Sequence, residues 1–329
     1  MDIVTSPLNV LWLLGAMIAA LVAGSAVRVA WLVTTHSEKT AAFLARLRTW
    51  WVLTLLFVAV VLLGRTAAVL LFGVASWLSL REFFNITAKR TGVHAGQWLA
   101  YGIVPINYLW VWLGWYDVLW VSVPVGLFLL VSAYTVSAGK TKGFLVDVAV
   151  ELWGVMLLVF CLSHAALLFA LPKATNPVAG VSGWFLFLVL LTEMNDIAQA
   201  LWGRRFGKHQ VTPRVSPHKT WEGLILGATT TVLLAMMLGS LLTPLDGYPV
   251  FGKGDTAITL PLFWSAVAGL IIAIGGFFGD ITMSAVKRDS EVKDSGTILP
   301  GMGGVLDRVD SLTFTAPLFF YFVYFLCGH

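Results

Sequence analysis

Charged residues and cysteines are both scarce in this chain of 329 residues. Asp, Glu, Lys and Arg make up 12% of it, against about 25% in a typical soluble domain, which argues against a solvated globular fold. Cys161 and Cys327 both fall in apolar stretches, so neither a disulfide framework nor a cysteine metal site is expected. No basic segment precedes the first apolar run, which favours a retained membrane span over a cleaved signal peptide.

Hydrophobic residues dominate the chain and make up 58% of it. The apolar runs approach about 20 residues, which predicts an all-α, polytopic integral membrane protein with about ten transmembrane helices. The segments 1–180 and 181–329 hold the N-terminal helices and the C-terminal helices with the charged motifs, and we expect them to form one integrated membrane domain. The predicted spans are 8–33, 50–64, 66–82, 97–114, 117–136, 145–171, 182–202, 221–242, 261–286 and 311–327.

The placement of Lys and Arg predicts the orientation of these spans. Most of them fall in or beside the loops that alternation puts on one side, and the other side has little beyond Arg65, Lys173 and Lys253. By the positive-inside rule the basic loops are cytoplasmic and both termini lie outside. We therefore expect a protein of the cell inner membrane whose site faces the cytoplasm. The basic loops are 34–49, 83–96, 137–144, 203–220 and 287–310.

The stretch 279–311 contains many charged residues between apolar segments. Charged side chains next to a membrane-spanning segment are energetically unfavourable, so their presence indicates a functional role. Asp280, Ser284, Lys287 and Arg288 recur at i, i+4, i+7 and i+8, on one face at the end of the ninth predicted span. Asp280 is then expected inside the membrane on the face that carries the cations. A solvated charged loop is the plain alternative, but an intramembrane aspartate argues against it.

A glycine-rich turn and two more carboxylates complete this stretch. Residues 300–304 read Pro-Gly-Met-Gly-Gly, and glycines let the backbone approach an anionic ligand closely. Asp307 and Asp310 follow on one helical face, and carboxylates without a His or Cys cluster suit Mg²⁺ better than zinc. Carboxylates, a metal and cationic side chains together suit phosphoryl or nucleotidyl transfer, in which positioning and charge neutralisation do the catalysis.

Two upstream segments carry residues suited to the same site. Asp196 lies inside an apolar run shortly before a basic loop, where it needs a partner or a metal; an ion pair between helices is the alternative. Farther on, Ser216 or Thr220 can cap the next span, whose first backbone amides favour an anion. Lys219 suits a phosphate, although lysines at membrane edges commonly only mark the cytoplasmic side.

Residues 284–311 read S-A-V-K-R-x4-K-D-S-G-x3-P-G-M-G-G-V-L-D-R-V-D-S. This stretch resembles the long motif of the phosphatidate cytidylyltransferases, also called CDP-diacylglycerol synthases. The resemblance covers about residues 190–315, and the N-terminal half is similar only as a set of apolar helices. The upstream segments that match in order are Asp196, Gly203-x3-Gly207-Lys208, Ser216-Pro217-x-Lys219-Thr220-x-Glu222-Gly223 and Gly279-Asp280.

The resemblance implies an enzyme that joins CTP and phosphatidate, or a related lipid phosphate, into CDP-diacylglycerol with release of pyrophosphate. It implies Mg²⁺, with K⁺ as a candidate second cation, and places the metal-binding aspartates at Asp280 and Asp307. Its partners are the two substrates and membrane lipid, with no nucleic acid. A homodimer is left open, because apolar membrane faces look alike whether they meet lipid or a second subunit. The predicted catalytic residues are Asp280, Asp307, Lys219, Arg308 and Lys287, and the predicted substrate-binding residues are Asp196, Ser216, Arg288, Lys293, Asp294 and Asp310.

Two positions depart from the family pattern. Met302 stands where the motif has His, and Met283 stands where the preceding G-D-x-x-E-S segment has Glu. Methionine carries no charge and donates no hydrogen bond, so activity or substrate changes if that His assists catalysis, and little changes if it only packs. The alternatives are a cytidylyltransferase or CTP-dependent kinase for another lipid phosphate or alcohol, and a non-catalytic lipid-binding paralogue. A transporter explains the helices but not so many phosphate-suited residues on one face.

Overall fold

The computed structural model describes residues 7–35, 40–91, 96–139, 141–251 and 257–327. In this part of the chain, nine helical segments are long and apolar enough to cross a membrane. The elements are α1 (Leu8–Thr35), α2 (Thr40–Leu63), α3 (Arg65–Thr91), α4 (Gln97–Leu113), α5 (Tyr116–Val121), α6 (Phe128–Ser137), α7 (Phe144–Val155), α8 (Leu162–Leu167), α9 (Gly180–Phe206), β1 (Gln210–Thr212), β2 (Ser216–Thr220), α10 (Trp221–Leu242), α11 (Phe263–Asp289), α12 (Leu306–Val309) and α13 (Leu312–Leu326).

The predicted all-α polytopic fold is confirmed. Short π-helical segments join α5 to α6 and α7 to α8, so each pair forms one long span. The predicted span 97–114 forms α4, which has 17 residues. At about 1.5 Å per residue α4 is about 26 Å long, a little less than the hydrocarbon core of a bilayer.

The helix ends and one loop differ from the prediction. Helix α2 begins at Thr40 instead of residue 50, and α3 continues to Thr91 instead of ending at 82. Hydropathy marks only the part of a helix that lies in the membrane, whereas backbone hydrogen bonding continues into polar sequence. The predicted loop 203–220 contains an antiparallel hairpin, in which Thr212 of β1 pairs with Ser216 of β2.

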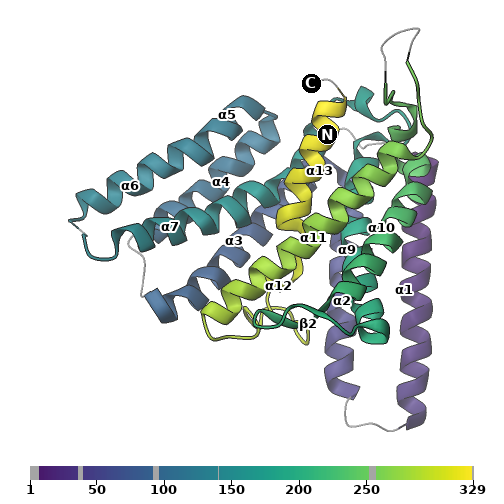
Figure 1. Cartoon of the computed structure of the whole chain (residues 1–329), viewed down its shortest axis with the longest axis horizontal. Helices are drawn as coiled ribbons and strands as arrows, with labels where there is room; N and C mark the ends of the chain where they lie inside the picture. Colours follow the sequence, from purple (N-terminus) through teal and green to yellow (C-terminus); the bar gives the residue numbers. More distant parts are fainter. Residues whose placement is uncertain (1–6, 36–39, 92–95, 140, 252–256, 328–329) are drawn as a thin grey trace.

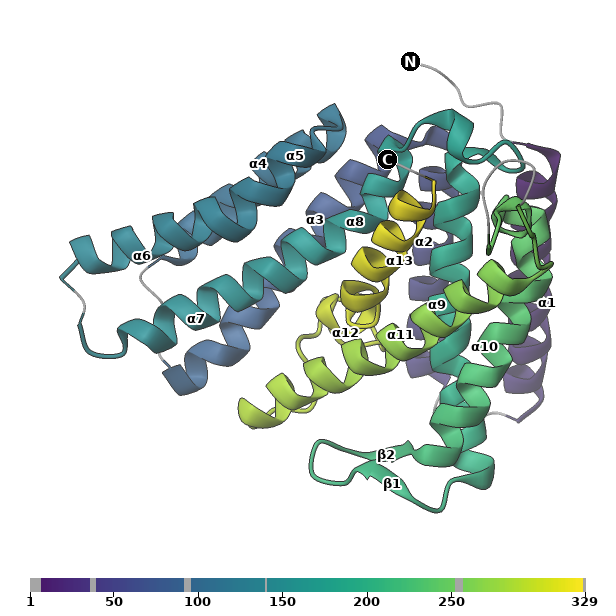
Figure 2. The same ribbon diagram turned by 45° about the horizontal axis from the view of Figure 1, so that its top comes forward.

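Helix α9 forms the core of the C-terminal half. It packs against α10, α11 and α13, and its residues Trp184, Phe185 and Phe187 are almost fully buried. Phe319 of α13 stacks on Phe187 with ring centroids 5.6 Å apart. Figures 1 and 2 show this group of helices beside a second group made by α3 to α7.

One end of the molecule gathers the elements that carry the charged motifs. In both views the β1–β2 hairpin, the C-terminal end of α11 and the segment before α12 lie together, and α13 ends at the opposite end (Figures 1 and 2). Because α9 ends at Phe206 just before the hairpin, and α10 starts just after it, the sequence segments 196–223 and 279–311 meet at this end.

Candidate active site

Lys219 and Asp280 form the first ion pair of the site. Lys219 is the penultimate residue of β2, and its Nζ lies 2.6 Å from Oδ2 of Asp280 on α11. The Ser284 hydroxyl donates to the other carboxylate oxygen of Asp280 at 3.3 Å. Lys219 also donates to Oε1 of Gln199 on α9 at 3.4 Å. The structure therefore brings Lys219 and Asp280 together, as the sequence predicts, and links α9 to the pair through Lys219.

Thr220, rather than Ser216, caps α10. The Thr220 hydroxyl accepts the backbone N–H of Gly223 at 3.2 Å, as an N-cap residue does. Glu222, in the first turn of α10, accepts the backbone N–H groups of Lys208 and His209 at 3.0 and 3.2 Å. A carboxylate of the protein thus lies at the start of α10, where the sequence suggested an anionic ligand. The predicted binding residue Ser216 lies in the hairpin, paired with Thr212.

Asp196 and Asp310 lie beside Asp280. The Ser311 hydroxyl donates to Oδ2 of Asp196 at 2.7 Å, and Asp310 is close enough to Asp280 and Asp196 for their charges to act on it. Oδ1 of Asp196 is buried and has no hydrogen-bond donor among the described residues. A buried carboxylate oxygen without a donor destabilises the folded protein, and a bound cation would compensate for the missing donor.

The carboxylates of Asp196, Asp280 and Asp310 meet the requirements of a metal site only in part. Within the described ranges, no three His, Cys, Asp or Glu side chains form a ready-made cage. Mg²⁺ does not need one, because it is commonly held by one or two carboxylates together with substrate phosphates and water. Asp280 and the unsatisfied oxygen of Asp196 match that requirement.

Asp307 lies in a separate niche of hydrogen bonds. Its Oδ1 is 2.7 Å from Nζ of Lys287, and its Oδ2 accepts the backbone N–H groups of Ser295 and Gly304, both at 3.1 Å. The side chains of Asp307 and Lys287 are 8% and 13% exposed. The two predicted metal ligands, Asp280 and Asp307, thus each pair with a different lysine, and their joint role in binding a metal stays a prediction.

The glycine-rich turn 300–304 is shaped around these carboxylates. Gly301 and Gly303 have φ values of 73° and 87°, a region that L residues with a side chain rarely adopt. At Gly304 a side chain would collide with Ser295 and with Glu82 of α3. The turn therefore needs glycine at these positions for geometric reasons, and the backbone N–H of Gly304 donates to the Asp307 carboxylate.

Glu82 is a site residue that the sequence analysis missed. It is 3% exposed and accepts the backbone N–H groups of Val305 and Leu306 at 3.0 and 2.9 Å. The Ser295 hydroxyl lies 2.9 Å from Glu82 and 3.0 Å from Asp307, so its single hydrogen serves one carboxylate at a time. A glutamate at the end of an apolar span was the available signal, but its partners lie more than 200 residues away.

We expect Glu82→Ala to lower the thermal unfolding midpoint of the purified protein clearly. The change leaves the backbone N–H groups of Val305 and Leu306 without their buried acceptor, a loss on the order of 3 kcal/mol, while the Ser295 hydroxyl keeps Asp307 as an acceptor. Thermal unfolding followed in detergent measures the effect. Glu82→Gln, which keeps one acceptor oxygen, should lower the midpoint less; an unchanged midpoint in Glu82→Ala would show that Glu82 does not hold this segment.

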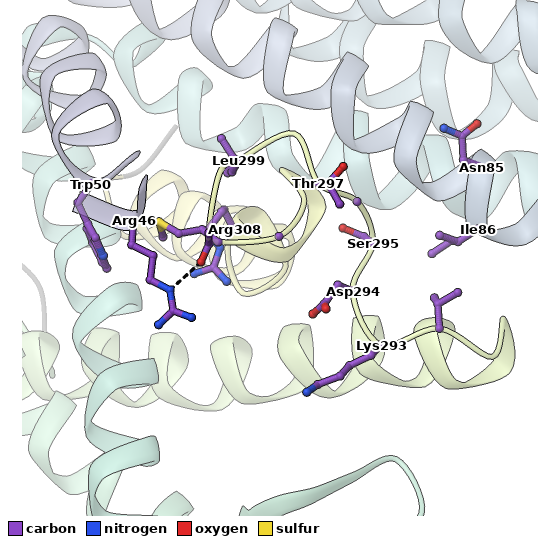
Figure 3. Close-up of a pocket in the computed structure, with 15 residues that line it drawn as sticks. Arg46, Trp50, Asn85, Ile86, Lys293, Asp294, Ser295, Thr297, Leu299 and Arg308 are labelled. Atoms are coloured by element: carbon purple, nitrogen blue, oxygen red, sulfur yellow. Dashed lines mark hydrogen bonds between the residues drawn. The ribbon is translucent and has the colours of Figure 1, made fainter. Parts of the chain in front are cut away.

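Three of the remaining predicted residues line a cavity of about 1010 Å³ beside the turn (Figure 3). Lys293, Asp294 and Arg308 line it, and so does Met302. Arg308 also acts electrostatically on Asp196, which places the cavity next to the carboxylate group. Arg288 is turned away to the hairpin, where its Nε donates to the backbone oxygen of Val215 at 3.4 Å.

Fold and site together define a polytopic membrane protein with carboxylates and phosphate-suited cations gathered at one end of its helices. The pattern of the Cytidylyltransferase family matches residues 44–326. The chain belongs to this family, and the resemblance found in the charged stretch is confirmed.

Individual relatives agree with this assignment. The chain is 43% identical over 282 residues to the uncharacterized protein YnbB of Escherichia coli (strain K12), covering 86% of this chain and 87% of that protein. It is 34% identical over 272 residues to the phosphatidate cytidylyltransferase of Haemophilus influenzae, covering 69% of this chain and 90% of that protein. The phosphatidate cytidylyltransferase of Brucella suis biovar 1 is 36% identical over 163 residues, 50% of this chain and 54% of that protein. The family and these relatives support a membrane-embedded nucleotidyltransferase of phospholipid synthesis.

Proposed function

We propose that this protein transfers the cytidylyl group of CTP to phosphatidate, giving CDP-diacylglycerol and pyrophosphate. The observation that carries the proposal is the convergence of Lys219 with Asp196, Asp280 and Asp310, next to a cavity lined by Lys293 and Arg308. Phosphate groups need several cations in one place, and nucleotidyl transfer needs little else from the protein. Two relatives that carry the name phosphatidate cytidylyltransferase support the same substrate.

In the proposed reaction an oxygen of the lipid phosphate attacks the α-phosphorus of CTP. The new phosphorus–oxygen bond forms as the bond between the α-phosphorus and the bridging oxygen to the β-phosphorus breaks, and pyrophosphate leaves with that oxygen. The attacking phosphate is already anionic near pH 7, so no strong general base is required. Lys219, Lys287 and Arg308 neutralise the phosphates, and the lipid enters sideways between helices from the bilayer.

Mg²⁺, when bound, would supply positive charge that offsets the phosphate charges and stabilises the departing pyrophosphate. Asp280 is the carboxylate that we assign to it first, with Oδ1 of Asp196 as the oxygen that lacks a donor among the described residues. Asp307 would join them only if Lys287 moves to a substrate phosphate, because both oxygens of Asp307 already have donors. K⁺ remains a candidate second cation.

We place the site at the cytoplasmic face of the inner membrane. The hairpin, the end of α11, the segment before α12 and α12 itself contribute, in that order, Lys219, Lys287, Lys293 and Arg308 at one end of the molecule. The positive-inside rule puts such an end in the cytoplasm. CTP is available on that side.

The direct test supplies purified protein in lipid nanodiscs with CTP and phosphatidate and identifies the lipid product by mass spectrometry. We expect CDP-diacylglycerol with Mg²⁺ present and a loss of at least about 10²-fold in rate after chelation with EDTA, restored by added Mg²⁺. A rate that EDTA leaves unchanged would exclude the metal assignment. A lipid product of another mass, or none, would exclude the substrate assignment.

One observation favours a second candidate, a cytidylyltransferase acting on a different lipid phosphate. Met302, which replaces the His of the family motif, lines the cavity together with Arg308, so the replacement alters the wall of the proposed substrate site. Methionine supplies an apolar, polarisable surface where the His offers hydrogen bonds. Offering the protein several lipid phosphates in competition with phosphatidate distinguishes this candidate from the first.

A further inference from the structure

Helix α2, far from the charged stretch in sequence, reaches the glycine-rich turn directly. The Thr49 hydroxyl donates to the backbone oxygen of Pro300 at 3.0 Å, and Nε of Arg46 donates to the backbone oxygen of Gly301 at 2.9 Å. The bond at Nε fixes the plane of the guanidinium group and leaves its two terminal nitrogens available. Figure 3 shows Arg46 beside Arg308 at the edge of the cavity.

The cavity wall carries more positive than negative charge. Arg46, Lys293 and Arg308 line it, and Asp294 is the carboxylate in the same lining. Within the part of the chain that the structure describes, the side chains of Lys293 and Arg308 and the terminal nitrogens of Arg46 have no hydrogen bond or ion pair. Three cations beside one carboxylate leave an excess of positive charge in the lining, and a bound anion would offset it. Arginine suits phosphate because it can donate two parallel hydrogen bonds.

We propose that Arg46 of α2 binds a substrate phosphate in this cavity, together with Lys293 and Arg308. The inference rests on the proposed function and extends it to a residue outside the family motif. Two sources supply the same chemistry, the phosphate of the lipid headgroup and the phosphates of CTP. Trp50, one turn after Arg46, lines the same cavity and is 43% exposed, which gives the site an aromatic side chain of the kind found at membrane interfaces.

Arg46→Gln tests the inference through the KM values for CTP and for phosphatidate, measured separately in nanodiscs. A lost charge-assisted hydrogen bond to phosphate should raise one KM by about tenfold or more, with a smaller change in kcat. A rise for phosphatidate alone assigns the lipid phosphate, and a rise for CTP alone assigns the nucleotide. Arg46→Lys, which keeps the charge without the two parallel donors, should lie between wild type and Arg46→Gln.

Two further variants separate phosphate binding from support of the turn. Arg48→Gln removes the same charge two residues away, at a position that does not line the cavity, and should leave both KM values unchanged. Thr49→Val removes the bond to Pro300 but keeps Arg46. If Thr49→Val raises KM as much as Arg46→Gln, or if Arg46→Gln changes neither KM, the inference is overturned.

A failure of the Arg46 inference can be distinguished from a failure of the proposed function. If the wild-type protein makes no cytidylylated lipid, the proposed function fails, and equilibrium binding of labelled CTP and of labelled phosphatidate then decides on Arg46. Weaker binding of either probe to Arg46→Gln than to Arg48→Gln supports the phosphate site. Equal binding of both probes to the two variants overturns it.

Discussion

Asp280→Asn should reduce the rate of cytidylyl transfer by about 10³-fold at saturating CTP and Mg²⁺. Asp280 is the carboxylate around which the other site groups gather, since Lys219 pairs with it at 2.6 Å and its charge acts on Asp310. The amide keeps the shape of the side chain but removes the charge that a metal ion and Lys219 require. Initial rates of lipid product formation measure the loss.

A matched control shows whether the loss is specific to the site. Asp117→Asn makes the same chemical change at an exposed carboxylate in the first turn of α5, outside the site, and should keep the wild-type rate. The thermal midpoint of Asp280→Asn should stay close to that of the wild type, because its side chain is 26% exposed. An Asp280→Asn protein that keeps more than about a tenth of the wild-type rate would remove Asp280 from the proposed mechanism.

Asp307→Asn should abolish activity and also destabilise the protein. Lys287 and Asp307 are 13% and 8% exposed, and removing one partner of a buried ion pair leaves the other charge uncompensated, at a cost of about 3–5 kcal/mol. The thermal midpoint and the initial rate of the variant are measured on the same preparation. Both are expected to fall.

The double variant Asp307→Asn with Lys287→Met separates the two effects. Removing both charges restores much of the stability, because no buried charge is left without a partner. The rate stays low, because the phosphates have lost Lys287 and the site has lost a carboxylate. A double variant that regains both stability and the wild-type rate would show that the pair has only a structural role.

The sequence was a good guide to the membrane helices and a poor guide to where they stop. Apolar runs predicted the spans because the bilayer requires them. Helix α2, however, starts as early as Thr40 and α3 continues to Thr91, and hydropathy does not show where a helix ends within polar sequence. The hairpin Gln210–Thr220 went unrecognised because its strands have only three and five residues. Such short strands carry no period that a hydropathy window can detect.

Within the site, sequence reasoning found charges more readily than partners. The convergence of Lys219 with Asp280 was predictable because each lies at the end of a predicted span that faces the same side of the membrane. The surroundings of Asp307 could not be predicted, because its donors include the backbone N–H groups of Ser295 and Gly304, and no residue pattern shows where a backbone N–H points. In the sequence, Arg46 is one of several positive charges in the predicted cytoplasmic loop 34–49. Its role was not predictable, because only the fold brings α2 to the glycine-rich turn.

The position of a radioactive label tests the central claim, cytidylyl transfer to a lipid phosphate, most directly. The protein in nanodiscs with phosphatidate receives CTP labelled at the α-phosphorus in one reaction and at the γ-phosphorus in another, and the lipid extract is counted. Cytidylyl transfer puts the α-label into the lipid and releases the γ-label as pyrophosphate. The γ-label in the lipid without the α-label would show a CTP-dependent kinase instead, and neither label in the lipid would contradict a catalytic role toward phosphatidate.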